Sequence, residues 1–248
     1  MKLAILTDLH ANREAVQTCL AQARAAGVDR FAFIGDYVGY GADPAWVVDQ
    51  VRSLVEHEGA VAVLGNHDNA TAREPSATMD PEAADASQWT RSQLDASQLR
   101  FLGSLPLTAT LGHCLFVHAN AWAPAEWGYI HSRGDAVRSL QATDRLYTFC
   151  GHVHEPRLYH MSATAKVLDF QPVPGVAVPL LPTRRWLVIP GSAGQSRDAN
   201  PAVCWASFDT ESLELVLHRV PYDFDTAAAK VLAAGLPPRW AERLRTGV

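Results

Sequence analysis

The first 70 residues repeat one unit, in which a short apolar run is followed by a polar cluster and then by a segment with helical periodicity. The apolar runs occupy residues 3–6, 31–34 and 60–64, and their spacing of about 30 residues is that of β-α-β units. Parallel strands need a crossover of this length, usually a helix, to return the chain in the same direction. The repeat therefore predicts an α/β fold whose first strands are parallel.

Two helices are predicted between these runs. Asn12 can cap the first, whose apolar residues recur on one face, and Gly27 is suited to its end. Asp43 followed by Pro44 is a typical start for the second, which ends before Gly59.

After residue 70 the pattern changes. Residues 70–79 form a loop of low hydrophobicity and residues 80–102 are predicted to be helical, so a helical and loop excursion covers about 70–104. Later strands are expected at residues 114–117, 146–150, 185–189, 203–208 and 213–220. Short helices at 226–234 and 239–244 close the chain, and the Pro-rich stretch 171–182 is predicted to be a surface excursion.

Polar clusters follow the apolar runs at five places. They contain Asp8, His10, Asp36, Asn66, His67, Asp68, His118, His152 and His154. Each cluster alone is more often an ordinary turn, but ligands in open α/β sheets collect at the carboxyl ends of the strands, so we expect these to converge. Oxygen and imidazole donors without a thiolate suit divalent Mn, Fe, Co, Ni or Zn. The sequence predicts a metal site at these strand ends.

Composition narrows the class of protein. A chain of 248 residues with 48% apolar residues is expected to form one domain over 1–248. A net charge of −5 disfavours long nucleic acid as a partner, which would call for a basic surface. The four cysteines are widely spaced and are expected to be free thiols in a reducing compartment. We found no stretch of membrane length and no leader pattern, which predicts a cytoplasmic protein without a membrane partner.

The clusters occur in the order D-x-H, G-D, G-N-H-D, H and G-H-x-H between Asp8 and His154, and this order resembles the calcineurin-like metallophosphoesterase superfamily. The resemblance implies an α/β fold that is a four-layer αββα sandwich with mixed sheets, and a dinuclear metal site at the carboxyl ends of the strands. Two divalent ions per chain are implied (Mn, Fe, Zn, Ni or Co), and manganese is the ion expected to support activity best.

The resemblance also assigns roles. One ion is expected to bind Asp8, His10, Asp36 and His154. The other is expected to bind Asp36, Asn66, His118 and His152, so that Asp36 bridges the two. His67 is implied to lie outside the metal shell, oriented by Asp68, which can also favour the charged form of its ring. Asp36, His67 and Asp68 are the expected catalytic residues, and Asn66 also touches substrate.

Residues 35–41 read G-D-x-V-G-Y-G, which resembles a branch of small bacterial and archaeal phosphodiesterases. Protein phosphatases and dinucleoside tetraphosphatases have an Arg-Gly step where Gly39, Tyr40 and Gly41 stand here. The expected reaction is hydrolysis of small phosphodiesters or nucleotides by in-line attack of a metal-bridging hydroxide, with His67 as general acid. A phosphomonoesterase and a non-catalytic scaffold on the same fold are the alternatives.

Other residues near the motifs have two interpretations each. Trp122, Trp127 and Tyr129 lie in an aromatic loop of about 119–131 that could stack a nucleobase, or pack beneath a loop or in a homo-oligomer. Arg197 could bind phosphate, contact a subunit or form a surface ion pair. Ala119, after His118, stands where the family usually has glycine, a departure that is expected to reshape the substrate rim without touching a ligand.

Overall fold

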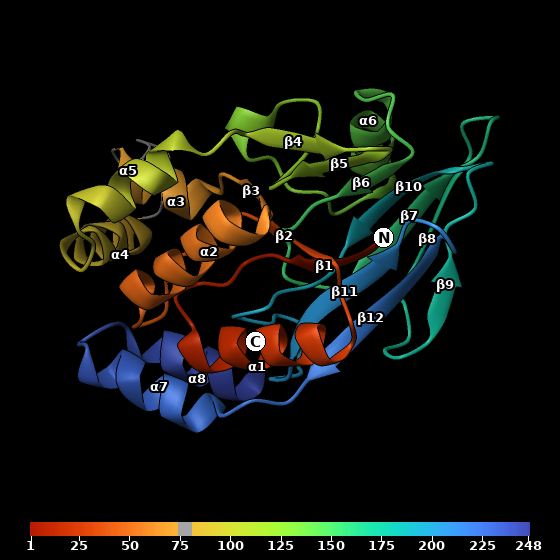
Figure 1. The fold of residues 1–248 in the computed structure, drawn as a ribbon. Coiled ribbons are helices and arrows are strands. Elements are labelled where there is room, and N and C mark those ends of the chain that lie inside the picture. Colours follow the sequence, from red (N-terminus) through yellow and green to blue (C-terminus); the bar gives the residue numbers. More distant parts are fainter. Residues whose placement is uncertain (74–80) are drawn as a thin grey trace.

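The structure is a computed structural model that describes residues 1–73 and 81–248, and it contains two six-stranded sheets packed face to face (Figure 1). The strands of the first sheet are, in spatial order, β3 (Val61–Val63), β2 (Arg30–Ile34), β1 (Lys2–Leu6), β11 (Val203–Asp209), β12 (Glu214–Val220) and β9 (Ala177–Pro179). Those of the second are β4 (Thr108–Leu111), β5 (Cys114–Val117), β6 (Tyr147–Phe149), β10 (Arg185–Ile189), β7 (Arg157–Met161) and β8 (Val167–Phe170). Both sheets mix parallel and antiparallel pairs.

Helices cover the outer face of each sheet. α1 (Arg13–Ala25) and α2 (Pro44–Glu58) pack on the first sheet, and α6 (Arg133–Gln141) packs on the second (Figure 1). α7 (Phe224–Ala233) packs against both α1 and α8 (Pro238–Thr246). The predicted four-layer αββα sandwich with mixed sheets is confirmed.

Strand β1 shows why the sequence gives two buried faces. Leu3 and Ile5 belong to the core between the sheets, while Ala4 and Leu6 belong to the core beneath the helices. Successive side chains on a strand point to opposite faces, so a strand covered on both sides is apolar throughout. The short apolar runs of the sequence are therefore the central strands.

The predicted helix ends are confirmed for α1 and α2. The Asn12 side chain accepts a hydrogen bond from Ala15 N at 3.2 Å, which caps α1. Pro44 is the first residue of α2, and Gly59 ends it in a left-handed conformation. Asp43 makes no capping bond and instead accepts a bond from Lys230 Nζ at 2.8 Å, which ties α7 to the start of α2.

The predicted helix over 80–102 is wrong in its continuity. α4 (Pro81–Ser92) and α5 (Ala96–Ser104) are separate because Asp95 caps the second, accepting from Ser97 N and Gln98 N. The predicted loop over 70–79 is wrong at its start, where α3 (Asn66–Ala72) is still helical, and its remainder from 74 lies outside the described residues.

Among the described residues, four strands and two α-helices were not predicted: β4, β7, β8, β9, α3 and α6. The stretch 171–182 is only partly a surface excursion, because β9 lies within it and pairs with β12. This segment joins β8, an edge strand of the second sheet, to β9, an edge strand of the first.

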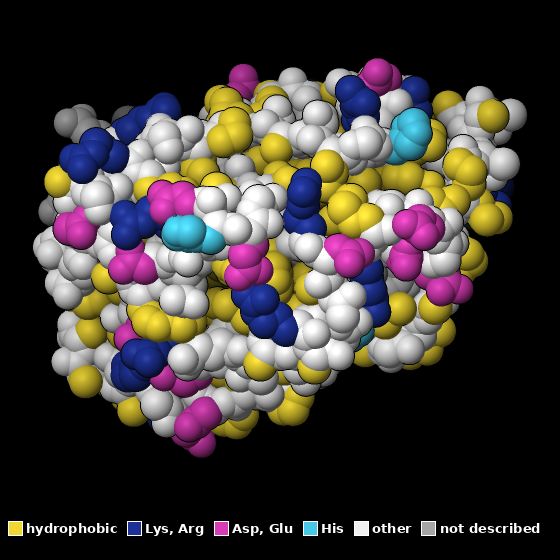
Figure 2. Space-filling view, viewed as in Figure 1, with side chains coloured by type: hydrophobic (Ala, Val, Ile, Leu, Met, Phe, Trp, Pro, Cys, Tyr) yellow, Lys and Arg dark blue, Asp and Glu magenta, His cyan; other side chains and the backbone are white. Residues whose placement is uncertain are grey.

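The state of the cysteines matches a simpler expectation. All four cysteines are buried free thiols, as predicted. Basic and acidic side chains are intermixed over the face in Figure 2. None of the described helices is both long enough and apolar enough to cross a membrane.

Candidate metal centre

The polar clusters lie at one end of the sandwich. Asp8 and His10 follow β1, Asp36 follows β2, and α3 begins at Asn66 after β3. The later clusters stand in the same positions of the second sheet, with His118 after β5 and residues 152–154 after β6. Convergence at the carboxyl ends of the strands is confirmed by the distances that follow.

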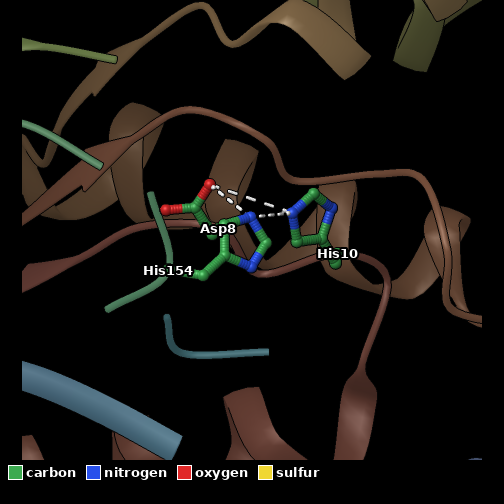
Figure 3. A group of neighbouring side chains, drawn as sticks. All are labelled: Asp8, His10 and His154. Atoms are coloured by element: carbon green, nitrogen blue, oxygen red, sulfur yellow. Dashed lines mark hydrogen bonds and ion pairs between the residues drawn. The ribbon is translucent and has the colours of Figure 1, made fainter. Parts of the chain in front are cut away.

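Asp8, His10 and His154 form the first donor group (Figure 3). Asp8 Oδ1 lies 3.3 Å from His154 Nε2 and 3.8 Å from His10 Nε2, and the two ring nitrogens are 3.1 Å apart. All three side chains are at most 2% exposed.

The second donor group surrounds His118 Nε2. This nitrogen lies 3.1 Å from Asn66 Oδ1, 3.2 Å from His152 Nδ1 and 3.3 Å from Asp36 Oδ2. Asp36 Oδ2 is also 3.8 Å from His10 Nε2 in the first group. One carboxylate oxygen is thus shared between the two groups, in the bridging position that the motif implied for Asp36.

The hydrogen bonds of the imidazole rings point their other nitrogens into the site. The Nδ1 atoms of His10, His118 and His154 bond the carbonyl oxygens of Val38, Ile34 and Gln195, at 3.0, 2.8 and 2.6 Å. Because a carbonyl oxygen only accepts, each Nδ1 carries a proton, and in the neutral form of each ring Nε2 presents a lone pair.

These groups fit cations. The lone pairs of His10 Nε2 and His154 Nε2 face each other at 3.1 Å, which is repulsive unless a positive charge lies between them. Ligand atoms held about 2.0–2.2 Å from one ion lie about 3.0–3.6 Å apart, close to the separations in both groups. Each group could therefore hold a metal ion, and the nitrogen and oxygen donors suit the first-row divalent metals.

Two histidines of the second group have pKa values shifted in opposite directions when no cation is bound. Burial acts to lower the pKa of His118, but the nearby Asp36 carboxylate outweighs it and raises the pKa to about 9. Burial, followed by the charge of His118, lowers the pKa of His152 to about 3. A cation would replace the proton of His118, because a ligating nitrogen must be deprotonated.

The backbone at the ligands is unusual. Positive φ angles between 46° and 67° occur at Asp8, His10, Asp36, His152 and His154. Left-handed backbone costs a residue other than glycine on the order of 1 kcal/mol and gathers at functional sites. This conformation turns successive side chains inward directly after a strand.

Gly151 permits a close contact between the loops that follow β6 and β1 at the site. A Cβ atom there would lie 1.9 Å from Thr7 Oγ1 and 2.5 Å from Asp8 Oδ2. The amide of the next residue, His152, donates to Asp8 Oδ2 at 3.0 Å. The loop after β6 thus holds the Asp8 carboxylate from a distance that only glycine allows.

Asp68 has a different role from the one predicted. Its Oδ1 accepts from Tyr37 N and Val38 N, and its Oδ2 accepts from Asp36 N and Gly65 N. Four hydrogen bonds from backbone amides use the full acceptor capacity of a carboxylate. The prediction that Asp68 orients the His67 ring is therefore wrong. Burial and the charge of Asp36 raise the pKa of Asp68 to about 7, and a cation beside Asp36 would reduce that effect.

His67 lies beside the donor groups and in neither of them. Its ring centroid is 5.2 Å from that of His10 and 4.6 Å from that of Tyr40, and its backbone N donates to Asp36 Oδ1 at 2.9 Å. Burial, with a contribution from the charge of Arg197, lowers the pKa of His67. In the free chain burial thus opposes the charged form of the ring that Asp68 was expected to favour.

The predicted substrate contacts fall in different places. Tyr129 stacks on His152, with ring centroids 3.9 Å apart, and Arg197 lies 5.5 Å from the Tyr40 ring centroid. Trp122 instead packs in the core beneath α6, with Arg138 over its ring at 4.6 Å. The structure brings Tyr129 and Arg197 to the site but not Trp122.

The sequence interpretation missed Tyr40 as a site residue. Its ring contacts those of His10 and His67 and supports Arg197. The signal was present, since Tyr40 belongs to the G-Y-G step that distinguishes this chain from the phosphatases.

Comparisons with known proteins agree with this geometry. The family model for the calcineurin-like phosphoesterase superfamily domain matches residues 1–212. An uncharacterised protein of Methanocaldococcus jannaschii is 30% identical over 250 residues, which cover 99% of this chain and 98% of that protein.

Among solved structures, a metallophosphoesterase from Sphaerobacter thermophilus is 34% identical, with a TM-score of 0.88, and the match covers 100% of this chain and 99% of that one. A hypothetical protein from Pyrococcus horikoshii matches with a TM-score of 0.79 at 16% identity, over 100% and 98% of the two chains. The second likeness concerns the fold alone.

Proposed function

The chain belongs to the calcineurin-like phosphoesterase superfamily, and on that basis we propose that it is a phosphodiesterase acting on small phosphodiesters or nucleotides. The observation that supports this proposal most is the pair of buried donor groups that share Asp36 Oδ2. The first group is Asp8, His10 and His154 with Asp36, and the second is Asp36, Asn66, His118 and His152.

Two divalent ions held by these groups would supply a nucleophilic hydroxide at neutral pH and neutralise charge on the phosphoryl oxygens. The chain's own part is to fix the donors. Backbone carbonyl groups orient three of the histidine rings. The four hydrogen bonds that backbone amides donate to the Asp68 carboxylate hold the loop after β2 against the start of α3. Such rigid mounting keeps ligands in productive geometry.

His67 is the proposed general acid. It lies at the edge of the donor groups, so it can reach a leaving oxygen without binding an ion. Burial lowers its pKa in the free chain, and the negative charge of a bound phosphate acts in the opposite direction. Substrate binding would thus promote the protonated form that an acid requires.

Two aromatic rings support the preference for a diester. Tyr40 and Tyr129 stand beside His10 and His152, one next to each donor group. Flat rings beside the reacting phosphate suit a substrate whose phosphorus carries a second organic substituent, such as a nucleoside. A phosphomonoesterase on the same donors is the second candidate, because clamping of phosphoryl oxygens serves both ester types.

The test compares two esters with the same leaving group in protein loaded with Mn, Fe, Zn, Ni or Co. The kcat/KM for bis(p-nitrophenyl) phosphate should equal or exceed that for p-nitrophenyl phosphate, with manganese the most active ion. Elemental analysis should give two ions per chain. A strong preference for the monoester with every ion would favour the phosphomonoesterase, and full activity in chelator would refute the metal-dependent reaction.

The remaining proposals concern the partner molecule, the cellular compartment and the oligomeric state. A small phosphate ester rather than long nucleic acid is the proposed partner, in keeping with a net charge of −5, and the proposed compartment is the cytoplasm. A homo-oligomer stays a proposal that a measurement of molecular mass in solution would test.

A further inference from the structure

Arg197 stands beside the metal centre, and within residues 1–73 and 81–248 no acidic side chain pairs with it. Its guanidinium carbon lies 5.5 Å from the Tyr40 ring centroid, and that ring is 4.7 Å from the His10 ring. Its Nη2 donates a hydrogen bond to Gln195 Oε1 at 3.2 Å. Its Nε is buried and has no hydrogen-bond partner among the described residues.

Helix α8 brings a second arginine to the same place. Trp240 of α8 is buried against Tyr40, with ring centroids 5.0 Å apart. Arg243 stands one turn later, and residues three apart share a helix face. Burial, and then the charge of Arg197, lowers the pKa of Arg243, as expected for two guanidinium groups that lie near each other.

Neighbouring arginines pair with side-chain carboxylates, whereas among the described residues these two do not. Arg219 pairs with Asp198, and Arg245 of α8 pairs with Asp225 at 3.0 Å. Within the part of the chain that the structure describes, no aspartate or glutamate pairs with Arg197 or Arg243. Arg243 donates from Nε to Val248 O, at a long 3.4 Å.

Two positive charges on the elements that pack around the Tyr40 ring, partly desolvated and without a side-chain carboxylate partner among the described residues, favour binding of an anion. We propose that Arg197 and Arg243 form a subsite for a second phosphate of the substrate, one aromatic ring away from the metal centre. Arginine suits this role because its planar fork of donors matches phosphate oxygens. The inference rests on the proposed function and narrows its substrates to phosphodiesters that carry a further phosphate.

The position of α8 in the chain agrees with a role in substrate choice. The family match ends at residue 212, whereas α8 spans Pro238–Thr246. Arg243 thus lies outside the region that the family model matches, in an element where specificity can differ while the metal ligands stay the same.

The experiment uses two substrates with one leaving group in metal-loaded protein. They are the p-nitrophenyl ester of thymidine 5′-phosphate and the same ester with a 3′-phosphate. Wild-type kcat/KM should be about ten-fold or more higher for the 3′-phosphorylated ester, since a charge-assisted contact contributes at least that factor. Arg243→Gln and Arg197→Gln should each reduce this advantage to about two-fold or less.

Arg245→Gln is the matched control, because it removes one positive charge from the same helix and should leave the advantage unchanged. No advantage in the wild type, or an advantage that survives in both variants, would overturn the subsite. Failure to hydrolyse either ester would count against the proposed function instead. Calorimetric titration with thymidine 3′,5′-bisphosphate then decides the subsite alone: Arg243→Gln should weaken binding about ten-fold, and unchanged binding would reject it.

Discussion

The two ends of the sandwich differ in the polarity of the side chains that gather there. At the carboxyl ends of β1, β2, β5 and β6, buried carboxylates and imidazoles converge, with neighbouring donor atoms 3.1–3.8 Å apart. At the opposite end is a hollow of about 530 Å³ with mostly apolar walls, among them Met1, Leu111, Leu146, Phe208 and Leu213. A roomy apolar hollow is the usual first guess for a binding site. In this protein the carboxylate and imidazole donors place the expected binding site at the other end.

The comparison also separates stability from function. Buried charges and left-handed backbone at the polar end work against folding, whereas burial of aromatic and aliphatic side chains at the apolar end supports it. Substitutions at the two ends should therefore affect different measurements, activity at one and unfolding at the other.

Asp36→Asn should have the largest effect on activity. The amide keeps the shape of the carboxylate but loses the charge that both donor groups share, so kcat/KM should fall on the order of 1000-fold or more. Elemental analysis should show fewer than two ions per chain. Asp144→Asn, at an aspartate that is 85% exposed, is the control and should change neither quantity. Wild-type activity in the Asp36 variant would contradict the idea that activity depends on the polar end of the sandwich.

His67→Gln should have a smaller effect that depends on the substrate. Losing a general acid typically costs about 100- to 10000-fold where the leaving group needs a proton. A nucleoside or alkyl ester should therefore slow much more than a p-nitrophenyl ester, with metal content unchanged. Equal losses for both esters at full metal occupancy would show that His67 does not act as an acid.

Gly39→Ala should lower kcat/KM about 10- to 100-fold by displacing the His67 ring. A Cβ atom there would lie 2.6 Å from His67 Nδ1, and small misplacements of a catalytic group are costly. Gly27→Ala is the matched control, since Gly27 also has a positive φ but nothing within 4 Å of an added Cβ. Both variants should lose similar stability, and equal activity in both would contradict the contact with His67.

Phe208→Leu should have the smallest effect on activity. Phe208 is buried at the apolar end, with ring centroids 4.9 Å from Tyr147 and 5.6 Å from Phe149. The free energy of unfolding should fall by about 1–2 kcal/mol, measured by denaturant titration, while kcat/KM stays within about two-fold. Phe170→Leu, at a residue that is 36% exposed, should change unfolding much less. A large loss of activity in Phe208→Leu would show that the two ends are coupled.

The parts of the fold that the sequence predicted are those with strong local patterns. The central strands are covered on both faces and read as apolar runs, and a ligand at a strand end follows directly from such a run. α6 escaped prediction because only Ala136, Ser139 and Leu140 of its residues are buried. β9 spans three residues, too short to show a period, and its place depends on pairing with β12.

Contacts made by the backbone were the part of the site that was harder to predict from the sequence. The bonds of Asp68 go to amides from two loops, and no pattern of side chains in the sequence shows which amides come near. The break before α5 was more accessible. Asp95 and Gln98 have the spacing of a capping box, which marks a helix start within the predicted helix.

Left-handed backbone at five ligand positions has an evolutionary consequence. Glycine adopts this conformation without steric cost, so Asp8, His10, Asp36, His152 and His154 remain only while selection for the cations outweighs local strain. In a lineage that no longer needs them, glycine at His10 or His154 would relieve strain and remove a buried polar ring. Relatives that have drifted away from catalysis should therefore show glycine at these positions first, within a fold that is otherwise kept.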